Sequence, residues 1–286
     1  MKTRSSENGT TLFGLCKSDA QTLETPEQFD GYCVILIHSG QGNFHADFGT
    51  FGFSGPTVLF ATPTQMVYLK REENVDFEML RFHSDFYCIE YHHHEIACNG
   101  LLFNNIYLEP AIVLTPDEHS EFSGLFSQIA QELEKPSPSD LILQSYLQLI
   151  LAKSSQVKNR SMAREERIKP KDETMEKFKA LLETHFLDLR KPNEYADLLF
   201  LTPNNLSKRC RRYFGKTPSQ LITERLVLEA KKQLHLTRKS IKEIAYALHF
   251  EDEFYFSRVF KKFTHESPQS FRDKTGISIV ADLYMK

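Results

Sequence analysis

The C-terminal part of this 286-residue chain contains one pattern twice, about 50 residues apart. Residues 191–200 (KPNEYADLLF) correspond to residues 240–249 (SIKEIAYALH) at an offset of 49. Residues 206–213 (LSKRCRRY) correspond to residues 256–263 (FSRVFKKF) at an offset of 50. Because a solenoid needs at least three stacked repeats, two copies indicate a duplicated supersecondary unit.

Both copies have the features of a helix-turn-helix unit, in which a short helix, a tight turn and a second helix follow one another. Ser240 opens a capping box at the start of the later copy. In the earlier copy Thr202 can cap the second helix, with Pro203 at its first position. The small residues Ala196 and Ala245 stand where the second helix must approach the first closely. In the earlier copy, we expect the inward-facing residues of the second helix to be Leu206, Cys210 and Tyr213.

The outward faces of the two second helices are polar and basic. Amides and cations near the start of such a helix can reach base edges in DNA, whereas cations further along meet phosphates. We therefore predict base contacts from Asn204, Ser207, Lys208, Tyr255, Ser257 and Arg258. We predict phosphate contacts from Arg211, Arg212, Lys261 and Lys262. The alternative, two merely solvated basic faces, is disfavoured by two matching copies at a fixed spacing.

A long helix is expected between the two copies. Residues 217–220 (TPSQ) have the sequence of a capping box, and apolar residues continue at helical spacing to about Leu236. About 20 residues at 1.5 Å each span about 30 Å, close to the roughly 34 Å of one turn of B-DNA. A rigid connector of this length could place both second helices in successive major grooves on one face of DNA.

The net charge of −3 hides a strong asymmetry. Residues 1–155 hold 8 basic and 20 acidic residues, whereas residues 156–286 hold 27 basic and 18 acidic residues. This division indicates an acidic sensing or assembly half joined to a half that binds a polyanion. The five cysteines are scattered without CxxC spacing, and no apolar run approaches the roughly 20 residues of a membrane span. We therefore expect a cytoplasmic protein.

The N-terminal half has the pattern of a β-rich domain. Apolar and β-branched runs separated by turn residues about every 8–12 residues are typical of an antiparallel sandwich or small barrel. Residues 84–109 remain open between short helix and loop. The predicted strands are 32–38, 43–48, 57–61, 65–70 and 75–82.

Two amphipathic helices are predicted after these strands, over residues 116–134 and 138–153. Residues 115–118 (TPDE) have the sequence of a capping box at the start of the first helix. The short turn between the two helices indicates an antiparallel hairpin. Their apolar positions are expected to form a dimer seam or the domain core rather than a cofactor-binding surface. The candidate dimerisation residues are Leu143, Leu147, Ile150 and Leu151. The polar stretch that follows predicts a linker, so the expected domains are 1–155 and 173–286 with a linker over 156–172.

Residues from about 175 to 276 resemble the DNA-binding domain of the AraC/XylS family of transcriptional regulators. The residues that carry the resemblance are 225–226 (RL), 230–231 (AK), 240–245 (SIKEIA), 250–252 (FED), 255–262 (YFSRVFKK) and 267–272 (SPQSFR). The resemblance implies a seven-helix domain that binds double-stranded promoter DNA, usually as an activator working with RNA polymerase. The family usually has glycine where His249 and His265 stand, so we expect backbone strain or looser docking in the second copy.

The N-terminal half is similar to the cupin-like regulatory domain of the same family in its strand pattern and its helix pair. The expected fold is therefore an α+β multidomain protein, with a cupin-like β-barrel and helical hairpin followed by an all-α domain with two helix-turn-helix units. Such regulatory domains bind small effectors inside the barrel or only form dimers, and both alternatives stay open. An apolar pocket within residues 32–82 and a barrel filled by its own side chains are equally compatible with the sequence, and we expect a homodimer.

The leading interpretation is a transcription factor without catalytic activity or cofactor. Residues 92–95 (HHHE) and the separate His45 could suggest a metal site, but they lack the i,i+4 histidine pair or CxxC spacing that would support one. We therefore expect no metal. Two other hypotheses are a DNA-binding domain fused to a metal-dependent cupin enzyme, and an architectural protein that binds DNA without sequence preference.

Overall fold

The structure is a computed structural model that describes residues 2–5, 11–18, 22–47, 49–89, 100–168 and 172–277. The chain divides into two compact units. The first consists mainly of Met1–Asn105 and Glu109–Met162, and the second mainly of Ile106–Leu108 and Ala163–Asp273. In the described ranges, no helix combines the length and the apolar character needed to cross a membrane.

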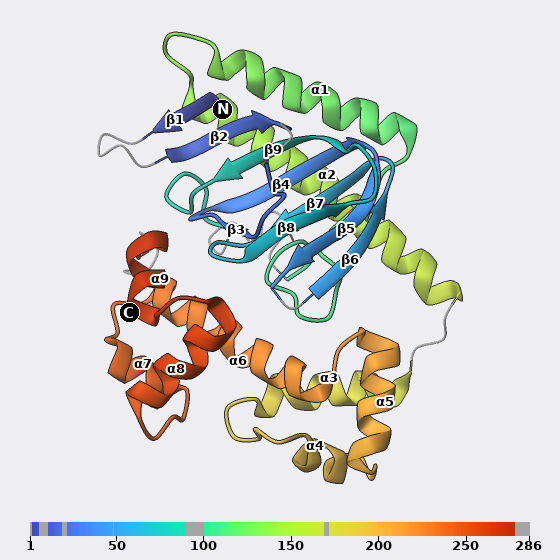
Figure 1. The fold of residues 1–286 in the computed structure, drawn as a ribbon, viewed down its shortest axis with the longest axis vertical. Helices are drawn as coiled ribbons and strands as arrows, with labels where there is room; N and C mark the ends of the chain where they lie inside the picture. Colours follow the sequence, from blue (N-terminus) through green and yellow to red (C-terminus); the bar gives the residue numbers. More distant parts are fainter. Residues whose placement is uncertain are drawn as a thin grey trace. The chain divides into compact units, whose positions relative to one another are not determined.

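The first unit contains two antiparallel sheets (Figure 1). The larger sheet has the strand order β1 (Lys2–Ser5), β2 (Thr11–Lys17), β9 (Asp76–Phe82), β4 (Tyr32–Ser39), β7 (Thr57–Ala61) and β10 (Ala111–Val113). The smaller sheet has the order β3 (Glu27–Gln28), β8 (Met66–Arg71), β5 (Gln41–Ala46) and β6 (Gly49–Ser54).

The larger sheet is covered on both faces. On one face Ile35 and Ile37 of β4 join an apolar cluster with Phe44 of β5 and Leu69 of β8, so this cluster lies between the two sheets. On the other face, alternate residues such as Leu36 belong to a second cluster shared with two helices. A strand buried on both faces needs apolar residues at every position, which explains the continuous apolar run of β4.

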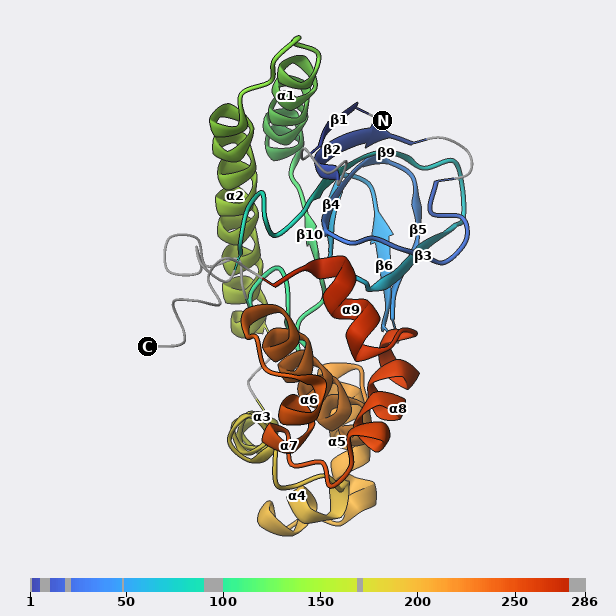
Figure 2. The ribbon, with the colours of Figure 1, turned by 90° about the vertical axis from the view of Figure 1, so that its left-hand side faces the viewer.

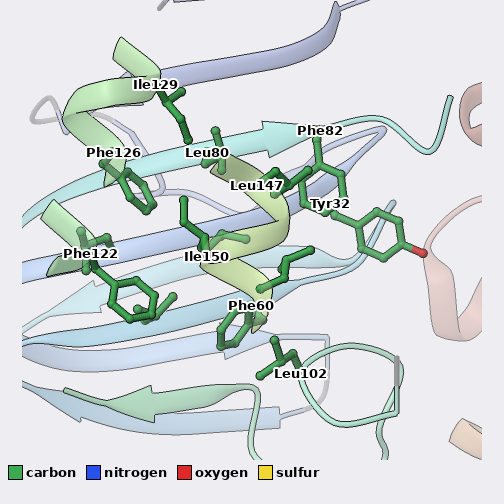
Figure 3. Packing of buried hydrophobic residues seen from close by; sticks show 14 of the residues in the cluster. Tyr32, Phe60, Leu80, Phe82, Leu102, Phe122, Phe126, Ile129, Leu147 and Ile150 are labelled. Carbon is green, nitrogen blue, oxygen red and sulfur yellow. The ribbon is translucent and has the colours of Figure 1, made fainter. Parts of the chain in front are cut away.

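Helices α1 (Pro116–Leu133) and α2 (Asp140–Ile168) cover this second face (Figure 3). The predicted capping box at the start of α1 is confirmed, because Thr115 and Glu118 each accept a hydrogen bond from the other's amide. Figure 3 shows Phe126 of α1 and Ile150 of α2 among the side chains that pack over Leu80 of the sheet.

The four residues suggested for a dimer seam form part of this core. Their side chains are completely buried within the single chain, and they pack in the cluster beneath α1 and α2. Of the two predicted roles, the domain core is therefore the one observed, and these side chains have no surface left for a second copy. The residues corrected in this way are Leu143, Leu147, Ile150 and Leu151.

The predicted linker is mostly helical, because α2 continues to Ile168 instead of ending near residue 153. Val157 and Lys158 are still buried against the first unit, and the Lys158 ammonium donates hydrogen bonds to the carbonyls of Glu109 and Ala111. The rest of α2, residues 159–168, contains three Arg and two Glu, residue types that favour helix without any apolar face. High helix propensity therefore replaces the irregular structure that the polar composition suggested.

The second unit consists of helices (Figure 2). Their apolar faces form one continuous cluster, which includes Phe178, Leu206, Leu226 and Phe260. In the described part of the chain, the seven helices that the resemblance implies are α3 (Glu173–His185), α4 (Pro192–Leu198), α5 (Pro203–Phe214), α6 (Pro218–Leu236), α7 (Ile241–Ala247), α8 (Glu253–Thr264) and α9 (Pro268–Thr275).

Candidate nucleic-acid interface

The two copies of the repeat adopt the same helix-turn-helix geometry. In the first copy, the amide of Leu201 donates to the carbonyl of Ala196 at 2.8 Å. In the second, the amide of Phe250 donates to the carbonyl of Ala245 at 2.9 Å. Both alanines are fully buried, as a close approach of the two helices requires. The duplicated helix-turn-helix predicted from sequence is thus confirmed in its backbone geometry.

Helix α5 is the second helix of the first copy. Its N-cap is Thr202, whose hydroxyl accepts from the Asn205 amide at 3.3 Å, and Pro203 occupies the first helical position. Leu206 and Cys210 are completely buried. The opposite face is exposed, and its residues are Asn204, Asn205, Lys208, Arg211 and Arg212, with Ser207 half-buried beside them.

Helix α8 is the second helix of the second copy. Its N-cap is Asp252, whose carboxylate accepts from the Phe254 amide at 3.0 Å and the Tyr255 amide at 2.9 Å. Phe256 and Phe260 are buried beneath it. Its exposed residues are Phe254, Tyr255, Arg258, Lys261 and Lys262, with Ser257 half-buried beside them.

Most of the cations predicted to contact DNA on these two faces are available for a ligand. Within the described ranges, Lys208, Arg211, Lys261 and Lys262 have no carboxylate within 4 Å. Arg212, by contrast, lies 3.8 Å from the Asp172 carboxylate, although its side chain is mostly exposed. A phosphate approaching Arg212 would therefore compete with this existing partner.

Asp172 connects the start of α3 to α5 of the first copy. It caps α3 by accepting from the amides of Thr174 and Met175, and it also binds the guanidinium of Arg209. Burial by itself would raise the pKa of Asp172, but the bonds from Arg209 and the Met175 amide outweigh it and lower that pKa. Arg209 is therefore held by the protein, while its neighbours on α5 face solvent.

The two copies are joined by α6 and its shared core. The capping box predicted at Thr217 and Gln220 is present. The 19 residues of α6 correspond to about 28 Å of helix, and Leu226 and Ala230 of α6 are buried in the cluster that contains both copies. The length and packing of α6 match the rigid connector expected from the sequence.

A second bridge between the copies comes from the turn between α3 and α4. The guanidinium of Arg190 donates to the carbonyl of Leu248 at the end of α7, and its Cζ lies 4.8 Å from the centroid of the Phe250 ring. Asp188 and the His249 imidazole lie 3.0 Å apart in the same contact. Sequence patterns gave no signal for this bridge, because Asp188 and Arg190 are distant in the chain from the residues that they contact.

The two histidines at the family's glycine positions have left-handed backbone conformations. His249 has φ +56° and His265 has φ +64°. Gly215 ends α5 with φ +69°, in the place that His265 takes after α8. Phe200, the counterpart of His249, also has φ +54°. Because such conformations are unfavourable for residues with a side chain, the expected strain is present in the second copy, and Phe200 adds strain to the first.

Other expectations from the sequence have mixed outcomes. Tyr213 does not point inward: its side chain is partly exposed, and its hydroxyl donates to Glu176 at 2.8 Å. His45 stacks on the ring of Tyr68 with centroids 4.1 Å apart. Residues 92–95 lie outside the described residues. Asn205 and Phe254, which are not among the predicted DNA contacts, are exposed at the starts of α5 and α8.

These features define a class of protein: a two-unit chain in which a β-rich domain accompanies a DNA-binding domain with two helix-turn-helix units. Comparison with known families agrees with both parts. Residues 17–151 match the AraC-like ligand binding domain, and residues 195–274 match a helix-turn-helix domain. The chain belongs to the AraC family.

The similar proteins are regulators from several bacteria. The arabinose operon regulatory protein of Salmonella typhimurium is 31% identical over 160 residues, covering 55% of this chain and 56% of that protein. The uncharacterized transcriptional regulatory protein YesN of Bacillus subtilis is 40% identical over 82 residues, covering 28% of this chain and 22% of that protein. The match therefore spans about half or less of the length of these two relatives.

More distant relatives are matched over longer stretches. The transcriptional activator RhaS of Enterobacter sp. is 23% identical, covering 62% of this chain and 72% of that protein. Among solved structures, ToxT from Vibrio cholerae is 17% identical with a TM-score of 0.40, covering 93% of this chain and all of that chain.

Proposed function

We propose that this protein is a sequence-specific transcriptional regulator that reads two successive major grooves of promoter DNA. The observation that carries the proposal is the repeated surface: two helices with the same preceding turn and a basic outward face, joined by one connector helix. If the two basic faces were only solvated, nothing would require the same arrangement to occur twice in the chain. The connector length of about 28 Å suits helices one turn of B-DNA apart.

The expected division of contacts follows the direction of each helix. Residues in the first two turns would meet base edges, since the start of a recognition helix enters the groove. Cations one turn further along would meet phosphates, which add affinity without sequence information. The proposed base contacts are Asn204, Ser207, Lys208, Tyr255, Ser257 and Arg258. The proposed phosphate contacts are Arg211, Arg212, Lys261 and Lys262.

The test is selection of binding sites by the full chain from random duplex DNA, followed by titration of the selected duplex and a shuffled duplex. We expect a clear preference for the selected duplex, with affinity that falls steeply as salt increases. Equal affinity for both duplexes would instead support an architectural protein. Stoichiometric iron, manganese or zinc in the purified chain would support the metal-dependent enzyme.

We further propose that the N-terminal unit responds to a small molecule. The match to a ligand-binding domain supports this proposal, and the apolar character of the side chains between the two sheets favours an apolar ligand. Binding should raise the melting temperature of the full chain and change its affinity for the selected duplex. If no compound in a broad metabolite set shifts the melting temperature, the filled barrel remains the better interpretation.

We propose that the chain forms a homodimer through the exposed face of α2. Leu141 is 74% exposed and Leu149 is 42% exposed, and Ser145 and Ala152 lie near them on the same helical face. Exposed apolar stripes of this kind often mark association sites. Replacing Leu141 and Leu149 with Asp should give monomers in light scattering, whereas a folded double variant that stays dimeric would exclude this face.

We also propose that the chain activates transcription together with RNA polymerase. The support is the activator role in the name of a relative such as RhaS. In transcription assays with purified RNA polymerase, the full chain should increase the yield from a promoter that carries the selected site. A decrease would make the protein a repressor.

A further inference from the structure

The two recognition helices offer different chemistry at the same position. Alignment of the repeat at an offset of 50 places Phe254 of α8 opposite Asn204 of α5, and Tyr255 opposite Asn205. Two amide side chains in the first copy are thus replaced by two aromatic rings in the second. Both rings are exposed, with 67% of Phe254 and 54% of Tyr255 accessible to solvent.

The backbone of these two aromatic residues is fixed by the helix cap. Each of their amides donates to the Asp252 carboxylate, at 3.0 Å for Phe254 and 2.9 Å for Tyr255. The side chains nevertheless differ in their surroundings. The Tyr255 ring lies 5.8 Å from the Phe250 ring and 5.8 Å from Cζ of Arg258. In the part of the chain that the structure describes, the Phe254 ring has no aromatic or cationic partner.

A phenylalanine in the major groove can recognise only one kind of group. It neither donates nor accepts hydrogen bonds, so it would leave the polar edges of adenine, guanine and cytosine unsatisfied. The thymine 5-methyl group is the apolar feature of the major-groove edge and is contacted by side chains such as Phe. Asn204, at the matching position, can instead pair with adenine through two hydrogen bonds.

We propose that Phe254 recognises a thymine methyl group, so that the DNA half-site read by α8 is specified by a methyl contact and the half-site read by α5 by hydrogen bonds. This inference rests on the proposed DNA binding. It gives a role to a residue outside the predicted set of base contacts, and it explains why a bulky apolar side chain is exposed at the start of a basic helix.

The experiment removes a single methyl group from the DNA. With the full chain, a duplex is selected from random DNA, and the half-site read by α8 is identified as the half whose base preferences do not change in the Asn204→Ala variant. Each thymine of that half is then replaced, one at a time, by deoxyuridine, which lacks only the 5-methyl group. At one position we expect the affinity of the unmodified chain to fall about fourfold, which is the change in affinity expected when one buried methyl-sized group is lost.

Three variants test whether the contact with the thymine methyl group is made by Phe254. Phe254→Ala should bind the thymine duplex more weakly and should be insensitive to deoxyuridine at that position, whereas Phe254→Leu should keep part of the preference for thymine. Asn204→Ala is the matched control, because it lies at the same position of the other helix and should keep the full deoxyuridine effect. Since Phe254 is exposed, circular dichroism should show that all three variants fold.

Three results would overturn the inference. The first is an equal deoxyuridine effect in the unmodified chain and in Phe254→Ala, and the second is a selected half-site without thymine. The third is unchanged affinity of Phe254→Ala for every duplex, which would show that the ring makes no contact with DNA that contributes to binding. Failure of the unmodified chain to prefer any duplex would be a different result, because it would refute the proposed function itself.

Discussion

The guanidinium of Arg190 lies over the ring of Phe250, with Cζ 4.8 Å from its centroid, while it donates a hydrogen bond to the carbonyl of Leu248. Arg190 lies in the turn that leads into the first helix-turn-helix copy, and the other two residues belong to the second copy. The Arg190 side chain therefore contacts the end of α7 and connects the two helix-turn-helix copies. Burial also lowers the pKa of Arg190, although it stays charged because of its high ordinary value.

Removing this bridge should loosen the fixed distance between α5 and α8. Arg190→Ala should lower the free energy of unfolding by about 1–3 kcal/mol, since it leaves a buried carbonyl without its donor. Arg190→Lys should recover only part of this loss, because an ammonium lacks the planar fork that both stacks and donates. Unfolding in urea measures this loss of stability.

In DNA titrations, Arg190→Ala should also tolerate one base pair inserted between the half-sites better than the unmodified chain does. Equal tolerance would contradict the bridging role.

The cations of α5 should separate into two functional groups. Lys208→Ala should relax the preference at one base position, with a discrimination loss of about 1–3 kcal/mol. Arg211→Ala should weaken binding to all sequences alike and should lower the salt slope by about one. Arg212→Ala should have a smaller effect than Arg211→Ala, because Asp172 already lies beside Arg212. Titrations with single-base variants of the selected duplex at several salt concentrations would measure all three.

The opposite distribution would show that α5 enters the groove in a different orientation. In that case Lys208→Ala would lose affinity uniformly, and Arg211→Ala would change the base preference. Arg209→Ala is an informative control, because Arg209 is held by Asp172 and should influence the stability of the domain more than the salt dependence of binding.

Glycine at the left-handed positions should stabilise the DNA-binding unit. Phe200 has φ +54° and is 96% exposed, so Phe200→Gly relieves backbone strain while it loses almost no packing. We expect the free energy of unfolding to rise by about 0.5–1 kcal/mol. Glycine removes the cost of the left-handed conformation, but its greater freedom in the unfolded chain offsets part of that gain. His265→Gly should behave similarly. Tyr246→Gly, at an exposed position inside α7, is the control and should destabilise instead.

A cluster of titratable groups joins α1 to the larger sheet of the N-terminal unit. Nδ1 of His38 on β4 lies 2.9 Å from Nε2 of His119 on α1, and Nε2 of His38 lies 3.2 Å from the Glu78 carboxylate on β9. The ammonium of Lys17 on β2 lies 3.6 Å from the same carboxylate. Burial and then the neighbouring His38 lower the pKa of His119, and the hydrogen bond from His38 lowers the pKa of Glu78 in spite of partial burial.

The stability of this unit should therefore fall as the pH decreases. His119 has an ordinary pKa of 6.5, so below that pH the unfolded chain binds a proton that the folded chain accepts less readily. Glu78 stabilises the fold above its ordinary pKa of 4.5, and this contribution is lost as the pH falls through its lower folded value. The His119→Gln variant should show a flatter dependence of melting temperature on pH between about 7.5 and 5.5. An unchanged slope, equal to that of a His185→Gln control in the other unit, would rule out His119 as a contributor.

The parts of the fold that sequence predicted best are those specified by local chemistry. Thr115, Thr202, Thr217 and Ser240 cap the helices that their patterns predicted. The five predicted strands are present with their ends shifted by at most two residues. The prediction missed β1, β2, β3, β6 and β10. Glycine interrupts the apolar pattern of β2, at Gly14, and of β6, at Gly52.

The candidate site was predictable only in part. The spacing of the repeat placed both exposed helix faces correctly, since helical period determines which residues share a face. The contacts of Arg190 and Asp172 depend on distant residues, so no local pattern could reveal them. The role of α2 was also ambiguous, because an apolar stripe that packs on its own sheet looks the same in sequence as one that packs on a second chain.

The common core of the two helix-turn-helix copies makes them one cooperative folding unit. If either copy were removed, by a protease cut within α6 or by a premature stop codon, the apolar faces of Leu226 and Ala230 would be left uncovered. The remaining copy would then lose its own packing as well. The pair, not the single copy, is therefore the smallest segment that can be inherited, transplanted or lost as a working module.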